Sequence, residues 1–171
     1  MKKPKNIVSK IIMKKVSELI PYVNNARTHT DKQVAELAAS ISELGFNDPI
    51  GLDGENGILE GHRRLLAALS LGMAEVPCME LSHLSSEQKR VYILAHNKHA
   101  LNAGWDLGIL LEETSALDAG LLDLAGFNQA GLDHLKIINE GGDMSQTSIF
   151  FEPEEKAAKK EKLCPHCGKK I

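Results

Sequence analysis

The sequence predicts a mixed α/β (α+β) fold, in which a small mixed sheet carries packed helices and a small helical lobe follows. In the first hundred residues, short apolar runs typical of strands alternate with turn-rich segments. Two helices in the same part begin with capping boxes. Further along the chain, leucines recur at helical spacing after capping residues. With 171 residues, the chain is long enough for one main domain and a small appendage.

Four apolar runs are expected to form strands. They cover Ile11 to Val16, Pro49 to Leu52, Ile58 to Leu59 and Glu75 to Leu81. The second and third runs flank Asp53-Gly54-Glu55-Asn56-Gly57, whose composition is typical of a turn, so we expect them to pair. Between the first two strands, Pro21 and the polar residues 24–29 indicate a loop.

The helices that begin at Thr30 and at Gly61 should pack against this sheet. Thr30 and Gln33 form the first box, and Gly45 ends that helix. Its apolar positions are Val34, Leu37, Ala38, Ile41 and Leu44. Ser85 and Gln88 repeat the pattern at the head of a helix that runs towards Asn97 and carries Val91, Leu94 and Ala95.

The helical lobe is predicted from two capping residues. Asp106 precedes Leu107, Leu110 and Leu111, and Asn128 precedes Leu132 and Leu135. The expected organisation is an N-terminal domain over 1–102, the lobe over 103–138, a linker over 139–162 and a cysteine-containing tail over 163–171.

Charge and hydropathy exclude several classes of protein. The chain has 20 Lys and Arg against 23 Asp and Glu, a net charge of −3, so it has no overall attraction to polyanions. Any nucleic-acid contact must come from a local basic patch. No apolar stretch is long enough for a signal peptide or a membrane span. We therefore expect a soluble, cytoplasmic protein without a membrane partner.

The segment Gly61-His62-Arg63-Arg64 is the strongest functional signal. It follows a short apolar run and opens the helical pattern Leu65 to Leu69, so two arginines lie where a helix begins. A helix N-terminus attracts anions and disfavours cations. A glycine, exposed amides and two guanidinium groups together describe a phosphate-binding turn. The alternative is a pair of solvated arginines on a surface helix.

Six sequence blocks in one order resemble the N-terminal domain of the ParB family. They are Asn25-Ala26-Arg27, Ala39-Ser40-Ile41, Gly45 to Ile50, Ile58 to Arg64, Val76-Pro77 and Ala95-His96-Asn97-Lys98. The likeness covers about residues 10–102 and includes the fold that this family shares with sulfiredoxin. The most similar variety is found in phages and mobile elements beside DNA methyltransferases.

The resemblance implies a nucleotide site. In the ParB family the arginine block binds the triphosphate of a cytidine nucleotide, and a later Glu-Asn pair helps to hold phosphate and Mg²⁺. Gly61, Arg63, Arg64 and Asn97 match this pattern, with a nucleoside triphosphate (CTP or ATP) and Mg²⁺ as expected cofactors. His62 stands where the family usually has glutamate. His96 replaces the acidic residue before the asparagine, which puts Mg²⁺-dependent hydrolysis in doubt because imidazole is a poor Mg²⁺ ligand.

Two basic residues complete the candidate binding set. Arg27 matches an arginine of the family's early loop and can reach the same pocket or DNA, or it can be a solvated loop residue. Lys98 follows Asn97 and can form a basic face with Lys89 and Arg90, or part of an ordinary solvated helix surface. We assign no catalytic residue from the sequence.

The C-terminal Cys164-Pro165-His166-Cys167 segment has half the ligands of a zinc ribbon. A complete site would need ligands from another chain. The tail therefore predicts a zinc-linked homodimer through Cys164 and Cys167, a zinc site completed by a partner protein, or a reduced, metal-free end. The isolated Cys78 lies in an apolar strand, where a thiolate is disfavoured.

Three functions are compatible with these patterns. The first is a nucleotide-binding, DNA-associated ParB-like regulator or adaptor of a phage or mobile element, whose partner is a DNA methyltransferase or another phage protein. Its DNA contact should be weak or non-specific and sensitive to salt, since no helix-turn-helix with a basic recognition helix is recognisable after residue 102. The second is a ParB-like nuclease. The third is a sulfiredoxin-like reductase, although Gly61 stands where that enzyme needs its cysteine.

Overall fold

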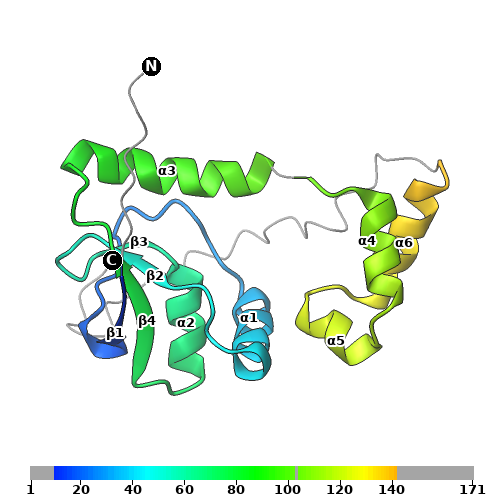
Figure 1. The fold of residues 1–171 in the computed structure, drawn as a ribbon, viewed down its shortest axis with the longest axis horizontal. Helices are drawn as coiled ribbons and strands as arrows, with labels where there is room; N and C mark the ends of the chain where they lie inside the picture. Colours follow the sequence, from blue (N-terminus) through cyan, green and yellow to red (C-terminus); the bar gives the residue numbers. More distant parts are fainter. Residues whose placement is uncertain (1–9, 103, 142–171) are drawn as a thin grey trace. The chain divides into compact units, whose positions relative to one another are not determined.

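The computed structural model of the protein describes residues 10–102 and 104–141, which divide into two compact units (Figure 1). The sheet unit comprises the described residues up to Tyr22 together with Ile41–Asn102. The helical unit comprises Val23–Ser40 and residues 104–141. The linker and tail expected from the sequence lie almost entirely outside the described residues. The domain boundaries drawn from the sequence stay a prediction.

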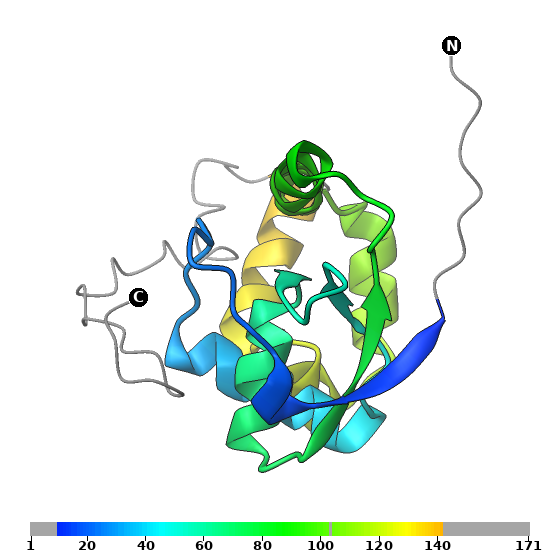
Figure 2. The ribbon, with the colours of Figure 1, turned by 90° about the vertical axis from the view of Figure 1, so that its left-hand side faces the viewer.

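The sheet unit is built on a four-stranded mixed sheet in the order β1-β4-β2-β3. The strands are β1 (Ile11–Lys15), β2 (Ile50–Leu52), β3 (Ile58–Glu60) and β4 (Glu75–Glu80). Strands β1 and β4 run antiparallel and side by side (Figure 2), β2 is parallel to β4, and β3 pairs antiparallel with β2. The predicted mixed sheet and the pairing of its two short strands are confirmed.

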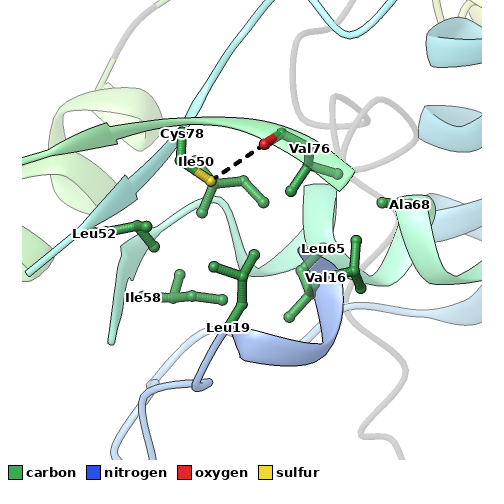
Figure 3. Packing of buried hydrophobic residues seen from close by; sticks show 9 residues of the cluster. All are labelled: Val16, Leu19, Ile50, Leu52, Ile58, Leu65, Ala68, Val76 and Cys78. Atoms are coloured by element: carbon green, nitrogen blue, oxygen red, sulfur yellow. Dashed lines mark hydrogen bonds between the residues drawn. The ribbon is translucent and has the colours of Figure 1, made fainter. Parts of the chain in front are cut away.

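One face of the sheet packs against helix α2 (His62–Ser70) and the short 3₁₀ helix η1 (Val16–Glu18), which ends the first strand one residue earlier than predicted. The buried side chains of this core, drawn in Figure 3, are Val16, Leu19, Ile50, Leu52, Ile58, Leu65, Ala68, Val76 and Cys78. Cys78 is fully buried, and this burial raises the pKa of its thiol, against a smaller opposing effect of Lys14. The expectation that its thiolate is disfavoured is confirmed.

The other face of β3 is covered by helix α3 (Ser86–Asn102). Ile58 and Leu59 point to opposite faces because side chains alternate along a strand, and Leu59 joins a second cluster with Leu81 and Ile93. The predicted capping box begins this helix. The Ser85 N–H donates to Gln88 Oε1 at 2.9 Å, and the Gln88 N–H donates to Ser85 Oγ at 3.3 Å.

Helix α1 (Asp31–Leu44) also begins and ends as predicted. The backbone N–H of Thr30 donates to Gln33 Oε1, and the N–H of Gln33 donates to Thr30 Oγ1, both at 3.2 Å. Gly45 follows the last helical residue with φ +89°, a left-handed conformation that closes the helix. The Asn47 side chain donates to the Leu44 carbonyl at 2.6 Å and so caps the end of α1.

The helical unit contains three short helices, each begun by a side-chain cap. They are α4 (Leu107–Ser115), α5 (Ala119–Leu124) and α6 (Gln129–Asn139), capped by Asp106, Asp118 and Asn128. Their shared core consists of Leu110, Leu122, Leu132 and Leu135. The two helices expected from the sequence are confirmed, whereas α5 was missed. No helix among the described residues is long and apolar enough to cross a membrane.

Candidate functional site

The turn between β3 and α2 requires glycine at position 61. Gly61 is the N-cap of α2, with φ +92° and ψ 19° in the left-handed region. A Cβ at this position would lie 3.0 Å from Arg64 Nη1, 3.2 Å from Ile50 Cγ1 and 3.3 Å from Ile50 Cα. The left-handed backbone conformation and the close neighbours therefore both disfavour a side chain at this position. The turn brings the first amides of α2 and two arginines to the same place.

Arg64 is held inward. Its side chain is 15% exposed, Nη1 donates to the Pro49 carbonyl, and Nη2 forms an ion pair with Asp48 Oδ2. The Asp48 side chain is 71% exposed. The Arg64 guanidinium thus bridges the start of α2 and the segment that leads into β2, with a carboxylate on its solvent side.

The two residues before Arg64 differ in their surroundings. Arg63 is exposed, whereas His62 is partly buried, and its Nε2 accepts a hydrogen bond from the Tyr22 N–H at 3.0 Å. An accepting Nε2 carries no proton, which places the ring proton of a neutral His62 on Nδ1. His62 therefore ties the turn to the segment after η1. Of the two neighbouring side chains, Arg63 is the one on the surface.

A buried carboxylate precedes the turn. The Glu60 side chain is 5% exposed and lies between β3 and α3. Its Oε2 accepts a hydrogen bond from the Tyr92 hydroxyl at 3.0 Å and lies 2.7 Å from His96 Nε2. Burial, followed by the Glu60 charge and hydrogen bond, raises the pKa of Tyr92 to about 12. The residues Glu60, Tyr92 and His96, called here the Glu60 cluster, fasten α3 to the strand that leads into the turn.

The sequence contains a signal for this cluster that our sequence reasoning missed. Glu60 ends an otherwise apolar run, and Gly51 is its partner on the neighbouring strand β2. A Cβ at position 51 would lie 2.6 Å from Glu60 Cγ. The absence of a side chain at Gly51 therefore makes the room that the Glu60 side chain occupies. A charged residue opposite a strand glycine is a pattern that can reveal such a site.

The remaining predicted site residues lie on α3 and in the loop before α1. Asn97 is partly buried and Lys98 is exposed, one and two residues after His96 on α3. Arg27 is partly buried in the helical unit, where its N–H donates to Asn25 Oδ1 at 3.2 Å. Its reach towards the turn stays a prediction, as do the binding roles of the other residues. Cys164 and Cys167 lie outside the described residues.

Lys89, considered above for a basic face, can also be placed. The Lys89 Nζ lies 3.8 Å from Oδ2 of Asp53, which is in the turn between β2 and β3. This contact gives Lys89 a partner within the protein.

Within residues 10–102 and 104–141, no group of three or more His, Cys, Asp or Glu side chains is placed to hold a metal ion. The structure thus brings together Gly61, His62 and Arg64 with Asp48 and Pro49, and it joins His96 to Glu60.

Comparison with known proteins agrees with this fold. A family model, the ParB N-terminal domain, matches residues 2–98. The Escherichia coli K12 ParB-like nuclease domain-containing protein YnaK is 44% identical over 81 residues, which cover 47% of this chain and 93% of that protein. The crystal structure of C-terminally truncated chromosome-partitioning protein ParB from Caulobacter crescentus, complexed with CTP-gamma-S, aligns with a TM-score of 0.57. That alignment has 20% sequence identity and covers 86% of this chain and 88% of that one, so it shows a shared fold.

Proposed function

This chain belongs to the ParB N-terminal domain family, and we propose that its Gly61–Arg64 turn binds the triphosphate of a nucleoside triphosphate. One observation carries the proposal: a left-handed glycine with close neighbours on its Cβ side begins a helix whose first turn contains two arginines and no acidic residue. Backbone N–H groups at the N-terminus of a helix attract phosphate oxygens. Guanidinium groups add charge-assisted hydrogen bonds to the same oxygens.

Each residue of the turn has a distinct part in this proposal. Arg63, on the surface, meets the phosphate chain first. Arg64 binds a second phosphate oxygen through the solvent side of its guanidinium. Asn97 and Lys98 approach from α3, whose position the Glu60 cluster fixes. His62 holds the backbone of the turn through Tyr22 and is a positioning residue.

The residues around the turn fit a phosphate better than a resident Mg²⁺ ion. Mg²⁺ prefers several oxygen ligands in octahedral geometry. The nearest buried carboxylate, Glu60, already accepts the Tyr92 hydroxyl and contacts His96. We propose that any Mg²⁺ arrives with the triphosphate and keeps most of its waters, without a dedicated protein site.

CTP is the first nucleotide to test, because the structural neighbour from Caulobacter crescentus is a complex with CTP-gamma-S. We propose a cytoplasmic, DNA-associated module with weak or non-specific DNA contact. The net charge of −3 confines that contact to a local basic surface. A phage setting, a DNA methyltransferase partner, and a zinc-linked homodimer through Cys164 and Cys167 are parts of the same proposal.

Isothermal titration with CTP, ATP and GTP tests the nucleotide site. The wild-type chain should bind at least one of them, and Arg63→Ala should weaken that binding by roughly tenfold or more, the effect of a lost charged hydrogen bond. Lys15→Ala is the matched control. It removes the same charge from an exposed position on β1, whose register partner on β4 is Glu75. Absence of binding by the wild-type chain, or equal loss in both variants, would contradict the proposal.

The name of the 44% identical relative supports a nuclease as a second candidate function. Nicking of supercoiled plasmid, dependent on added Mg²⁺ or Mn²⁺ and co-purifying with the chain, would support it. Nicking that separates from the protein on purification would argue against it. A reductase gains no support from Cys78, whose thiol is buried in the core with a raised pKa.

A further inference from the structure

We infer that the Asp48 carboxylate is an exchangeable counter-ion on Arg64, which a phosphate ligand displaces when it binds. Asp48 would then lower the affinity of the turn for anions and act as a built-in competitor. The inference rests on the proposed nucleotide site, because it concerns how that site is occupied before a ligand arrives. It adds a residue that the sequence patterns did not single out.

The two ends of the Arg64 guanidinium have partners of different kinds. Nη1 donates to the Pro49 carbonyl, a backbone group fixed at the entry to β2. Nη2 pairs with Asp48 Oδ2, a side-chain carboxylate. If Asp48 left, the contact with Pro49 would still hold the guanidinium in place. Nη2 would then offer a phosphate oxygen the same charge-assisted geometry that it offers the carboxylate.

The backbone around Asp48 is fixed while its side chain is open to solvent. On one side the Asn47 side chain donates to the Leu44 carbonyl at 2.6 Å, and on the other the Pro49 carbonyl accepts from Arg64. The Asp48 side chain itself is 71% exposed, against 15% for Arg64. Release of the carboxylate therefore needs a side-chain rotation into water and no movement of the chain. Such rotations take picoseconds to nanoseconds on exposed residues.

The expected size of the effect follows from the exposure of the pair. Exposed ion pairs are weak, so loss of this one by competition should reduce ligand affinity by roughly twofold to fivefold. A carboxylate left beside a bound phosphate also repels it. Together these effects predict that Asp48→Asn binds a polyphosphate roughly threefold to tenfold more tightly than the wild-type chain at low salt. The gain should shrink as ionic strength rises.

The test is titration of the full chain with tripolyphosphate and with CTP, for wild type, Asp48→Asn and Glu43→Gln. Glu43 is the matched control, since it is an exposed carboxylate near the end of α1 and its change removes the same charge. Asp48→Asn should bind both probes more tightly, with the larger gain at low salt, while Glu43→Gln should stay close to wild type. Thermal unfolding of each variant checks that the fold is kept, and Asp48→Ser serves if Asp48→Asn is impaired.

The outcomes separate this inference from the proposed function. If wild type binds and Asp48→Asn binds equally or more weakly, the counter-ion role is wrong and the nucleotide site stands. An equal gain in Glu43→Gln means that general charge, not the Arg64 pair, limits affinity, and the counter-ion role is again wrong. If no variant binds either probe, the proposed function fails and the inference fails with it. Binding by Asp48→Asn alone would support the inference in its strongest form, a turn blocked by its own carboxylate.

Discussion

Two carboxylates near the Gly61 turn occupy contrasting environments. Glu60 is buried between β3 and α3, where a tyrosine hydroxyl and a histidine ring surround its Oε2. Asp48 lies on the surface and shares one side of the Arg64 guanidinium with water. A buried carboxylate that loses its partners is costly, whereas an exposed ion pair contributes little to stability. The difference indicates that Glu60 stabilises the structure around the turn, whereas Asp48 affects how tightly the turn binds a ligand.

Gly61 follows Glu60 directly and lies against Arg64, the partner of Asp48. Replacement of Gly61 should therefore have the largest effect on stability. Gly61→Ala combines a left-handed φ with contacts to Arg64 and Ile50 at 3.0 to 3.3 Å. We expect a loss of about 3 kcal/mol in the free energy of unfolding, measured by urea titration. Gly72→Ala is the control, because φ is +67° and nothing lies within 4 Å of the added Cβ. That variant should lose only about 1 kcal/mol. Equal losses would mean that the space around Gly61 is not limiting.

Removal of the buried carboxylate should be the next largest effect. Glu60→Ala leaves the Tyr92 hydroxyl and His96 without their shared partner, and we expect a loss of about 2 kcal/mol in the free energy of unfolding. Hydrogen exchange of the α3 amides should increase, because the Glu60 cluster fastens that helix. Glu60→Gln retains an acceptor for Tyr92 and should lose less. A Glu60→Ala variant as stable as wild type would remove the contrast with Asp48.

The effect of the buried Glu60 carboxylate on its surroundings can be measured through the pKa of Tyr92. In a Tyr22→Phe background, ultraviolet titration should show Tyr92 losing its proton at a pKa of about 12, and Glu60→Gln should move this towards 10. The unfolded chain loses this proton first, so stability present below pH 10 should fall as the pH rises towards 12. Titration of Tyr92 at its ordinary pKa in both proteins would contradict the burial of its hydroxyl beside Glu60.

The smallest effect on stability is expected at the exposed carboxylate. Asp48→Asn should change the free energy of unfolding by about 0.5 kcal/mol or less, because Asp48 is 71% exposed and Arg64 keeps its contact with Pro49. Urea titration at low and high salt measures this change. A loss as large as that of Glu60→Ala would assign Asp48 a structural role and weaken the distinction between the two carboxylates.

The features that the sequence predicts well are those determined by neighbouring residues. Thr30 with Gln33, and Ser85 with Gln88, form the expected capping boxes because each box needs only a hydroxyl and an amide three residues apart. The turn between β2 and β3 and the start of α2 after Gly61 are similarly local. Helix α5 was missed because its six residues give too short a window for a periodic apolar pattern.

The interactions that the sequence did not predict join distant residues. Glu60 meets Tyr92 and His96, which are 32 and 36 positions away, through the packing of α3 on β3. Lys89 was considered for a basic face on α3. The packing of α3 on β3 instead brings its side chain to Asp53. The sequence identifies the Arg64 position through its motif, yet the partner Asp48 depends on how the end of α1 leads into β2. Contacts of this kind follow from tertiary packing, which local spacing does not encode.

The missing side chain at Gly51 has a consequence for how this site can change in evolution. Glu60 Cγ fills the volume where a Cβ of residue 51 would lie, at 2.6 Å. The two positions are therefore coupled by volume. We expect relatives with alanine or a larger residue at position 51 to have a shorter residue at position 60. Such relatives should also lack the contacts that Tyr92 and His96 make with Glu60. If positions 51 and 60 co-vary among relatives, a glycine at position 51 marks the presence of the buried carboxylate in a sequence.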